Sequence, residues 1–309
     1  MKENVYQSKE WQEATEKNGK KIFVIKIEEN DEIKAQVNAI EQEILTPLGK
    51  KKILFCEGTP IFENKEHGLQ ILNKFKEESK RYFYGLIRPS VLNQESVLFS
   101  NAEYKKVSDS TILIDLQKTE DELWQNLEKK SARWGVKTAE KNNLQFADIK
   151  NNEELQYFYN IYLKTAKDGG FKARSYDFLL CLHNSKIAKF FCIKSKNKII
   201  AGAAILLDNE YNILSLTSAT EEGYKMQAMP FLYWNLILYS KKSGKKYFDL
   251  GGYDKNAKPG DKIYNINKFK ENFNGEIVEQ THFATNWKYP FIRKLMTKMR
   301  FIKRLYTKN

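Results

Sequence analysis

The chain has 309 residues, more than a single compact core comfortably contains, so two lobes of about 150 residues are favoured. Hydrophobic residues make up 41% of the sequence, which is enough apolar surface to build a core, and this excludes a disordered chain. The formal net charge of +13 indicates affinity for an anionic partner: a nucleic acid, a phosphate-bearing substrate or an acidic membrane face.

The sequence contains no segment that predicts export or membrane insertion. Its first residues, MKENVYQSKEW, lack the apolar stretch of a signal peptide. No run anywhere approaches the roughly 18 consecutive apolar residues of a membrane span. We therefore expect a cytoplasmic protein.

The cysteines and histidines indicate neither disulfides nor a metal site. The cysteines lie in apolar runs without a CxxC pair, as reduced and buried thiols do. The histidines lack an HExxH arrangement or a second ligand at metal spacing. These residues are Cys56, Cys181, Cys192, His67, His183 and His282. We expect no metal and no cofactor.

The first third of the chain predicts strands around one helix. Apolar residues recur at spacing three within residues 67–81, at Leu69, Leu72 and Phe75, as one face of a helix requires. The predicted strands are 21–26, 33–44, 52–56 and 82–87. Of these, the segment 33–44 could also form a helix.

A capping box marks the start of the next predicted helix. It follows a predicted strand at residues 111–115. Thr119 precedes Glu122 by three residues, a spacing at which both side chains bind free amides of a first helical turn. We expect this helix to run over residues 120–141.

The remaining elements complete two successive α+β units, each with its own sheet. Predicted helices cover 152–167, 175–184 and 227–242, and another passes through 269–273. Predicted strands form a hairpin around 194–198 and lie at 212–219 and 246–250. Gly244 suits a left-handed residue that ends the third of these helices.

Two motifs near the end of the chain carry a family resemblance. Residues 247–252 are YFDLGG, and residues 269–275 are FKENFNG. In this order they resemble the "YDLGG … FKxxFGG" region of the Fem family of nonribosomal peptidyltransferases. Four further matches keep the family's order: Gln7-Ser8 with Trp11, Ile87-Arg88-Pro89, Arg133 with Ala139 to Lys141, and Ser218-Ala219-Thr220. The chain resembles the compact form of the family, without a coiled-coil arm.

The resemblance implies an α+β fold of two tandem GNAT-like lobes, related to the acyl-CoA N-acyltransferases. On this basis the first lobe covers residues 1–148 and the second covers residues 149–281. The tail, residues 282–309, is expected to pack back on the first lobe.

The family also implies an activity: transfer of an amino acid from aminoacyl-tRNA to a stem-peptide amine of a UDP-linked or lipid-linked muropeptide. An aminoacyl ester is already activated, so direct aminolysis needs no covalent enzyme intermediate. The enzyme must hold both reactants and stabilise the tetrahedral oxyanion, for which a fixed cation is suitable.

Three residues of the two motifs are the catalytic candidates. Lys270 matches the family lysine that is tied to catalysis and donor binding, and Phe269 matches the phenylalanine before it. Asp249 ends a strand at a glycine pair, where a carboxylate can accept backbone amides or orient a nearby cation. Each residue also has a purely structural explanation: a turn for Asp249, an apolar helix face for Phe269 and an exposed position for Lys270.

Basic residues elsewhere are candidates for phosphate contacts. Arg174, with Phe178 four residues later, resembles the family arginine that grips the acceptor's phosphates, and a guanidinium fork matches phosphate oxygens. Arg133, Lys137 and Lys141 recur at spacing four, which suits the backbone of a tRNA or a diphosphate. A solvated basic surface is the alternative in both places.

The tail combines positive charge with apolar residues. Residues 288–309 contain eight Lys and Arg and no Asp or Glu. Interleaved among them are Phe291, Ile292, Leu295, Met296, Met299, Ile302 and Leu305. Such a basic amphipathic helix can make peripheral contact with an anionic membrane face. Packing of its apolar face on the first lobe is equally consistent with the pattern.

Two other functions fit parts of the sequence. An N-acyltransferase that uses acyl-CoA would share the fold, although the usual pyrophosphate loop, Q/RxxGxG/A, is not evident. A noncatalytic binder of tRNA or of an acidic membrane would depend on charge alone.

Overall fold

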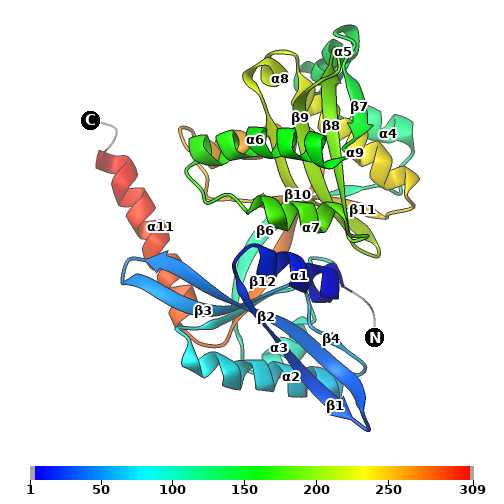
Figure 1. The fold of residues 1–309 in the computed structure, drawn as a ribbon. Coiled ribbons are helices and arrows are strands. Elements are labelled where there is room, and N and C mark those ends of the chain that lie inside the picture. Colours follow the sequence, from blue (N-terminus) through cyan, green and yellow to red (C-terminus); the bar gives the residue numbers. More distant parts are fainter. Residues whose placement is uncertain (1–3, 307–309) are drawn as a thin grey trace. The chain divides into compact units, whose positions relative to one another are not determined.

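The computed structural model describes residues 4–306, with side chains described as far as residue 297, and the chain divides into two compact units (Figure 1). Unit 1 consists of Met1–Asp109 and Glu279–Asn309, and unit 2 of Ser110–Val278. None of the helices in the described part of the chain has the length and apolar character needed to cross a bilayer.

Unit 1 is a mostly antiparallel sheet in the order β1-β2-β3-β5-β12, with β4 paired to β2. Among the described strands of this unit, only β3 and β5 pair in parallel. Its helices are η1 (Val5–Gln7), α1 (Lys9–Lys17), α2 (Lys65–Glu78), η2 (Ser79–Arg81), α3 (Ser96–Asn101) and α11 (Lys288–Tyr306). Its strands are β1 (Lys21–Glu29), β2 (Glu32–Thr46), β3 (Gly49–Glu57), β4 (Ile61–Phe62), β5 (Gly85–Arg88) and most of β12 (Glu276–Ala284).

Successive strand residues point to opposite faces of this sheet, and other elements of unit 1 cover both faces. One face packs on α2 and α3, where Phe75 and Phe99 are fully buried among Leu54 and its neighbours. The other face carries Ile53 and Leu86 against Tyr289 of α11. The sheet therefore holds the start of α11 against unit 1.

Unit 2 has the sheet order β6-β11-β10-β9-β8-β7, and only β10 and β11 pair in parallel. Its strands are β6 (Lys105–Asp115), which begins in unit 1, β7 (Gln145–Asp148), β8 (Ala188–Ser195), β9 (Lys198–Leu207), β10 (Tyr211–Ala219) and β11 (Tyr247–Tyr253). Its helices are α4 (Glu120–Asn126), η3 (Lys129–Arg133), α5 (Trp134–Lys141), α6 (Asn152–Gly169), α7 (Tyr176–His183), α8 (Glu221–Lys225), α9 (Ala228–Lys242) and α10 (Lys262–Glu271).

Helices cover both faces of the unit 2 sheet, with α6 and α7 on one side and α9 on the other (Figure 1). Neighbouring residues of β8 show this alternation. Phe191 belongs to the core with α5 and α9, whereas the ring of Phe190 meets Phe158 of α6 at 6.5 Å. On β9, Gly202 permits the approach of α6, because a Cβ there would lie 2.5 Å from the Phe158 ring.

The two units repeat one connection pattern. In unit 1, antiparallel β1, β2 and β3 are followed by α2 and then by β5, parallel to β3. In unit 2, β8, β9 and β10 are followed by α8 and α9 and then by β11, parallel to β10. Each repeat continues with a helix, α3 or α10, and a strand, β6 or β12. The expected α+β fold of two tandem GNAT-like lobes is confirmed.

The last strand of each repeat does not pair with the strand that precedes it in the sequence, but with a strand of the other repeat. Strand β6 pairs with β11 of unit 2, and β12 pairs with β5 of unit 1. The compact units consequently divide at residues 109 and 278. The lobe boundary near residue 148 refers to the sequence repeat and stays a prediction.

Most predicted elements are present, and one prediction was wrong. The ambiguous segment 33–44 lies in β2. The capping box at Thr119 is formed, but the helix after it is not continuous from 120 to 141. It stops at Asn126, because the backbone turns out at Leu127 and the amide of Glu128 donates to Asn272 O at 2.8 Å. This tertiary contact overrides the helical periodicity.

A close approach at the end of α10 gives a stability prediction. A Cβ at Gly275 would lie 2.5 Å from Ile112 Cγ2 and 2.8 Å from the carbonyl oxygen of Leu113. We expect Gly275→Ala to lower the free energy of unfolding by about 1–3 kcal/mol in urea titrations, because such overpacking shifts the backbone. Gly252→Ala is the matched control, since its Cβ meets no atom within 4 Å. Equal urea midpoints for Gly275→Ala and wild type would contradict this packing.

Candidate functional site

The sheet of unit 2 opens where its two parallel strands separate. Strand β11 pairs with β10 only between residues 211–213 and 247–249. Beyond this, β10 shifts register near Leu214 and stays paired with β9, while β11 continues along β6 as far as Tyr253. Open α/β sheets bind ligands outside the carboxyl ends of parallel strands. The carboxyl end of β11 is therefore the candidate site.

Asp249 lies at this point and is 6% exposed. Its Oδ1 accepts hydrogen bonds from the Thr111 hydroxyl and, at 2.7 Å, from the backbone amide of Gly251. Gly251 has φ 77°, a left-handed conformation that glycine adopts without strain. Burial raises the pKa of Asp249, while these hydrogen bonds and the charge of Lys270 oppose the shift. The carboxylate thus holds the glycine turn.

Lys270 reaches the same turn from α10. The side chain is largely buried, and Nζ donates to the carbonyl oxygens of Gly251 at 3.0 Å and Gly252 at 2.9 Å. Desolvation lowers the pKa of Lys270 to about 8, and the negative charge of Asp249 limits that shift. An ammonium has three donors, and these two bonds are the ones that Lys270 makes within the described residues. One N–H remains for a ligand.

Several contacts fix α10 relative to β11. The amide of Asn267, 3% exposed, donates to Asp254 O at 2.8 Å, just after β11 ends. The Tyr253 hydroxyl donates to Glu271 Oε1 at 2.8 Å. These bonds lie on both sides of Lys270 in the helix. The position of its ammonium is therefore set by the fold.

Phe269 turns to the hydrophobic core beside this site. Its ring meets Tyr233 of α9 edge-on at 4.9 Å and Phe273 at 5.5 Å. Burial raises the pKa of Tyr233 to about 12, so the phenol is neutral. The aromatic cluster packs α10 on α9. A role of Phe269 in substrate placement stays a prediction.

Arg174 is held next to Phe178 at the start of α7. Its guanidinium lies 4.5 Å from the centre of the Phe178 ring, which is fully buried. The hydroxyl of Tyr159 donates to Arg174 O at 3.2 Å, and the Arg174 amide donates to the Tyr162 hydroxyl at 3.1 Å. The backbone and the ring together present the guanidinium at a half-buried position.

This arginine belongs to a segment that contacts the start of α10. Lys262 Nζ, in the first turn of α10, donates to Asp168 O at the end of α6 at 2.5 Å. The loop from Asp168 to Ser175 therefore begins beside the helix that carries Lys270. The structure thus brings Lys270 and Asp249 together, and it connects α10, the helix of Lys270, to the Arg174 loop.

The three basic residues at spacing four have different surroundings. Arg133 donates to Gln125 Oε1 at 2.8 Å and to the carbonyl oxygens of Gln125 and Leu127 at 3.1 and 3.0 Å. It therefore closes the broken end of α4. Lys137 lies 6.0 Å from the Trp124 ring, and both Lys137 and Lys141 are exposed. Their contact with tRNA stays a prediction.

Sequence reasoning missed Thr111, the partner of the Asp249 carboxylate. Thr111 lies opposite Gly252 in the antiparallel register of β6 and β11. The pairing joins residues 138 positions apart. No local pattern signals it, and only the strand order could have found it.

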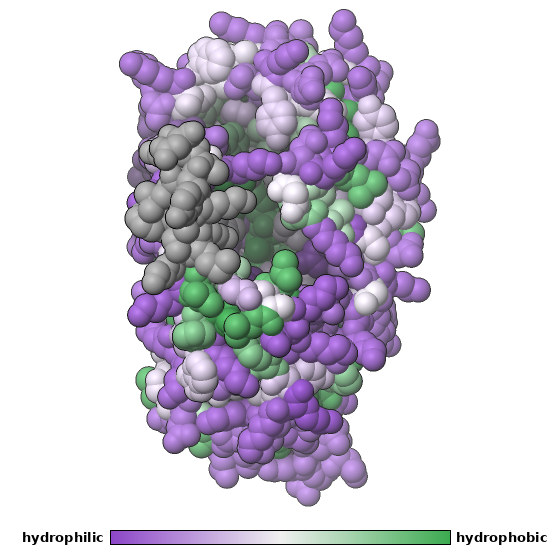
Figure 2. Space-filling model, turned by 90° about the vertical axis from the view of Figure 1, so that its left-hand side faces the viewer, coloured by the Kyte–Doolittle hydropathy of each residue, from purple (hydrophilic) through white to green (hydrophobic). Residues whose placement is uncertain are grey.

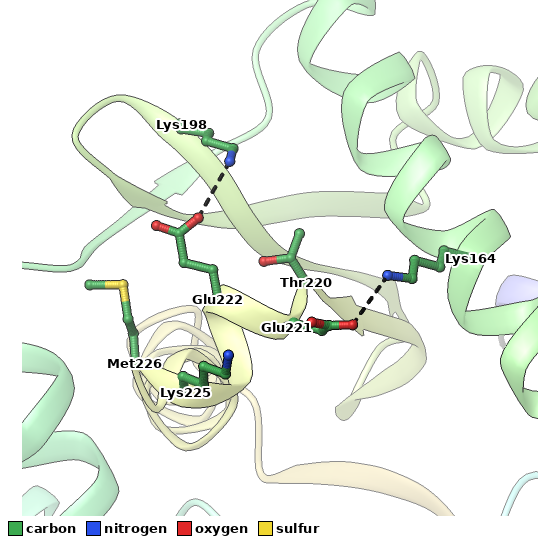
Figure 3. A pocket seen from close by; sticks show the side chains of 7 residues that line it. All are labelled: Lys164, Lys198, Thr220, Glu221, Glu222, Lys225 and Met226. Carbon is green, nitrogen blue, oxygen red and sulfur yellow. Dashed lines mark hydrogen bonds and ion pairs between the residues drawn. The ribbon is translucent and has the colours of Figure 1, made fainter.

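A second surface feature of unit 2 is an open hollow of about 640 Å³ at the start of α8 (Figure 3). Two of its lysines are paired with glutamates: Lys164 with Glu221 at 3.6 Å and Lys198 with Glu222 at 3.3 Å. The hollow is thus close to neutral. Within the described residues, no group of His, Cys, Asp and Glu is arranged to hold a metal ion.

Comparison with known proteins identifies relatives of this architecture. The sequence model described as the FemAB family matches residues 97–185. The crystal structure of FemX matches with a TM-score of 0.73 at 15% identity, covering 94% of each chain. No match was found among curated protein sequences.

Two further solved structures share the fold. The C-terminal domain of a putative lysylphosphatidylglycerol synthetase from Agrobacterium fabrum matches with a TM-score of 0.65 at 13% identity, covering 96% of this chain and 92% of that one. L-PGS from Bacillus licheniformis matches with a TM-score of 0.59 at 14% identity, covering 85% and 89%. At these identities the likeness shows the fold alone.

The burial of Lys270 predicts a pH dependence of stability. Its pKa is about 8 in the folded protein and 10.5 in an exposed lysine, so between these values the unfolded chain binds more protons. Stability should therefore rise with pH across this window, as the cost of the buried charge disappears. Lys270→Met, which keeps the apolar stem, should lack this rise. Urea unfolding from pH 7 to 10.5 measures the difference, and parallel curves for both proteins would contradict the assignment.

Proposed function

We propose that this chain, which belongs to the FemAB family, transfers an amino acid from aminoacyl-tRNA to a stem-peptide amine of a peptidoglycan precursor. One observation carries the proposal: a buried lysine ammonium is fixed on the carbonyls of a glycine turn at the carboxyl end of β11. The acceptor would be a UDP-linked or lipid-linked muropeptide. At the coarser level of reaction class, the family is one of acyl-group transferases.

Lys270 would act as the oxyanion donor of this reaction. The acceptor amine attacks the ester carbonyl of the aminoacyl group, and a C–N bond forms. The carbonyl oxygen gains negative charge, which the free N–H of the Lys270 ammonium can bind in a water-poor site. The intermediate then collapses, the ester C–O bond breaks, and the ribose hydroxyl leaves with the proton that the amine has lost.

Asp249 would act through the turn and through charge. It binds the Gly251 amide, which orients the two carbonyls that hold Lys270. Its negative charge also opposes deprotonation of the lysine. The ammonium form, which the oxyanion requires, is consequently retained at neutral pH. Asp249 is a positioning residue in this mechanism.

The phosphate-bearing substrates would be held by other basic groups. Arg174 is proposed to bind the diphosphate of the acceptor, because its guanidinium is positioned over the Phe178 ring and a guanidinium fork matches phosphate oxygens. Exposed Lys137 and Lys141 are proposed to contact the tRNA backbone. Arg133 supports them by fixing the start of their helix.

An acyl-CoA donor is the alternative within this fold. A pyrophosphate usually needs free amides at a helix start. The helix that follows β10 instead begins with Glu221 and Glu222, and the Thr220 hydroxyl accepts the amide of Gly223 at 3.0 Å. In the hollow of Figure 3, Glu221 and Glu222 pair with two of the three lysines, which leaves little positive charge for a diphosphate. The aminoacyl-tRNA donor is therefore preferred.

The first test follows label from radiolabelled aminoacyl-tRNA into UDP-linked and lipid-linked muropeptide. We expect transfer that RNase abolishes, and a loss of about 10²- to 10³-fold in kcat for Lys270→Ala, the usual effect of removing an oxyanion donor. Lys268→Ala is the matched control. Lys268 lies on the same helix, is exposed and pairs with Glu271 at 2.7 Å, so its loss should leave the rate nearly unchanged.

Two outcomes would contradict the proposal. Turnover of acyl-CoA by the same preparation, without transfer from any aminoacyl-tRNA, would establish the alternative donor. Transfer at the wild-type rate by Lys270→Ala would remove the lysine from the chemistry.

A second test concerns Arg174. Arg174→Lys keeps the charge but loses the fork, so we expect the KM for the acceptor to rise about 10-fold or more while kcat changes little. Lys172→Ala, two residues earlier and exposed, should leave the KM unchanged. The comparison is repeated with a stem peptide that lacks the diphosphate. An equal effect of Arg174→Lys on both acceptors would exclude phosphate binding by this residue.

A further inference from the structure

The start of α11 exposes two aromatic side chains next to each other. Trp287 is 62% exposed and Phe291 is 49% exposed, and their ring centres are 5.6 Å apart. They lie one helical turn apart and therefore share a face. Contiguous exposed aromatic residues are unusual on a soluble surface and indicate an interaction site.

The opposite face of α11 is held firmly by unit 1. Tyr289 and Ile292 are 6% and 3% exposed, and the rings of Tyr289 and Tyr84 lie 5.2 Å apart. Arg293 makes a double hydrogen bond to Asp109, at 2.7 and 2.6 Å. In the part of the tail with described side chains, one face thus packs on unit 1 and the other faces solvent. Met299, Ile302 and Leu305 lie outside the residues whose side chains are described.

A turn of unit 1 adds apolar side chains beside this helix. Leu45 and Leu48, at the end of the β2–β3 hairpin, are 76% and 55% exposed. Lys51 of β3 and Lys288 of α11 both lie over the Phe83 ring, at 5.8 and 5.1 Å from its centre. The shared ring places the hairpin next to the start of α11, as Figure 1 also shows.

We call Leu45, Leu48, Trp287 and Phe291 the apolar patch. Figure 2 faces this side of the molecule and shows apolar side chains gathered here among hydrophilic ones. Lysines lie around the patch, among them the exposed Lys50 and Lys294. Within the described residues, the one acid that pairs with Lys50 or Lys294 is Glu43, whose carboxylate lies 3.1 Å from the ammonium of Lys50. The sequence from Trp287 to the last residue contains no acid at all.

We propose that the apolar patch and its surrounding lysines dock on a membrane that contains anionic lipids. The patch consists of side chains that project from a helix and a turn, unlike the concave pockets that small ligands fill. Tryptophan and phenylalanine enter the interface between lipid headgroups and chains, and lysines bind the anionic headgroups there. Charge and shape thus both favour a bilayer as the occupant.

The proposal stands independently of the transferase activity. If both hold, unit 1 keeps the enzyme at the surface where a lipid-linked acceptor is found. Binding is therefore measured without substrates, and activity is measured separately with the soluble UDP-linked acceptor. A failure of docking would leave that activity intact, and a failure of the proposed activity would leave vesicle binding intact.

The experiment is co-sedimentation of the full chain with vesicles of phosphatidylcholine, with or without phosphatidylglycerol. We expect binding to the anionic vesicles that weakens with salt and is at least tenfold weaker in Trp287→Ser/Phe291→Ser. Lys50→Glu/Lys294→Glu should weaken it by about fivefold or more per lysine. The control is Trp134→Ser/Phe171→Ser, which removes a tryptophan and a phenylalanine that are 53% and 50% exposed in unit 2.

Three results would overturn the proposal. They are equal binding to neutral and anionic vesicles, wild-type binding by Trp287→Ser/Phe291→Ser, and an equal loss in the unit 2 control. Light scattering addresses a second copy of the chain as the occupant. A dimer that becomes a monomer in Trp287→Ser/Phe291→Ser, without vesicle binding by wild type, would assign the patch to self-association. Unchanged urea midpoints show that the variants are folded.

Discussion

The carboxylate of Asp249, which accepts hydrogen bonds from its own strand and from the neighbouring strand β6, is the constraint on which the candidate site depends. A buried carboxylate is costly unless hydrogen bonds satisfy it. Here the Thr111 hydroxyl and the Gly251 amide supply them. The second bond closes the glycine turn, the turn aims two carbonyl oxygens at Lys270, and these hold the ammonium in place. The Gly251 amide and the carbonyl oxygens of Gly251 and Gly252 each gain a hydrogen-bond partner in this way.

The fold makes this arrangement possible by ending one strand pairing early. After three residues β11 leaves β10 and follows β6, so its backbone carbonyls near the glycine pair are not used in a ladder with β10. Such carbonyls can bind a side chain or a ligand instead of a neighbouring strand. The same crossover pattern occurs at β3 and β5 of unit 1, but no equivalent lysine follows there in the described residues. The two repeats therefore share a scaffold and differ in chemistry.

Positive charge serves different purposes in different parts of the chain. Two arginines make structural contacts. Arg133 donates to carbonyl oxygens at the end of α4, and Arg293 binds Asp109. Lys270 is buried at the turn. Exposed lysines remain on α5 and around the apolar patch, where they can bind phosphates or headgroups. The basic residues behind the net charge of +13 therefore have several different roles.

The sequence by itself determined the local features of this protein. Apolar spacing and the Thr119 capping box predicted α2 and the start of α4, because such signals act within a few residues. The motifs around Asp249 and Lys270 indicated the candidate site for the same reason, since each is a continuous segment. Only the tertiary structure decided what joins them. The Thr111 contact, the break of the helix at Leu127 and the two faces of α11 all depend on residues far apart in the chain. Strand order and packing determine such contacts, and a linear pattern does not contain them.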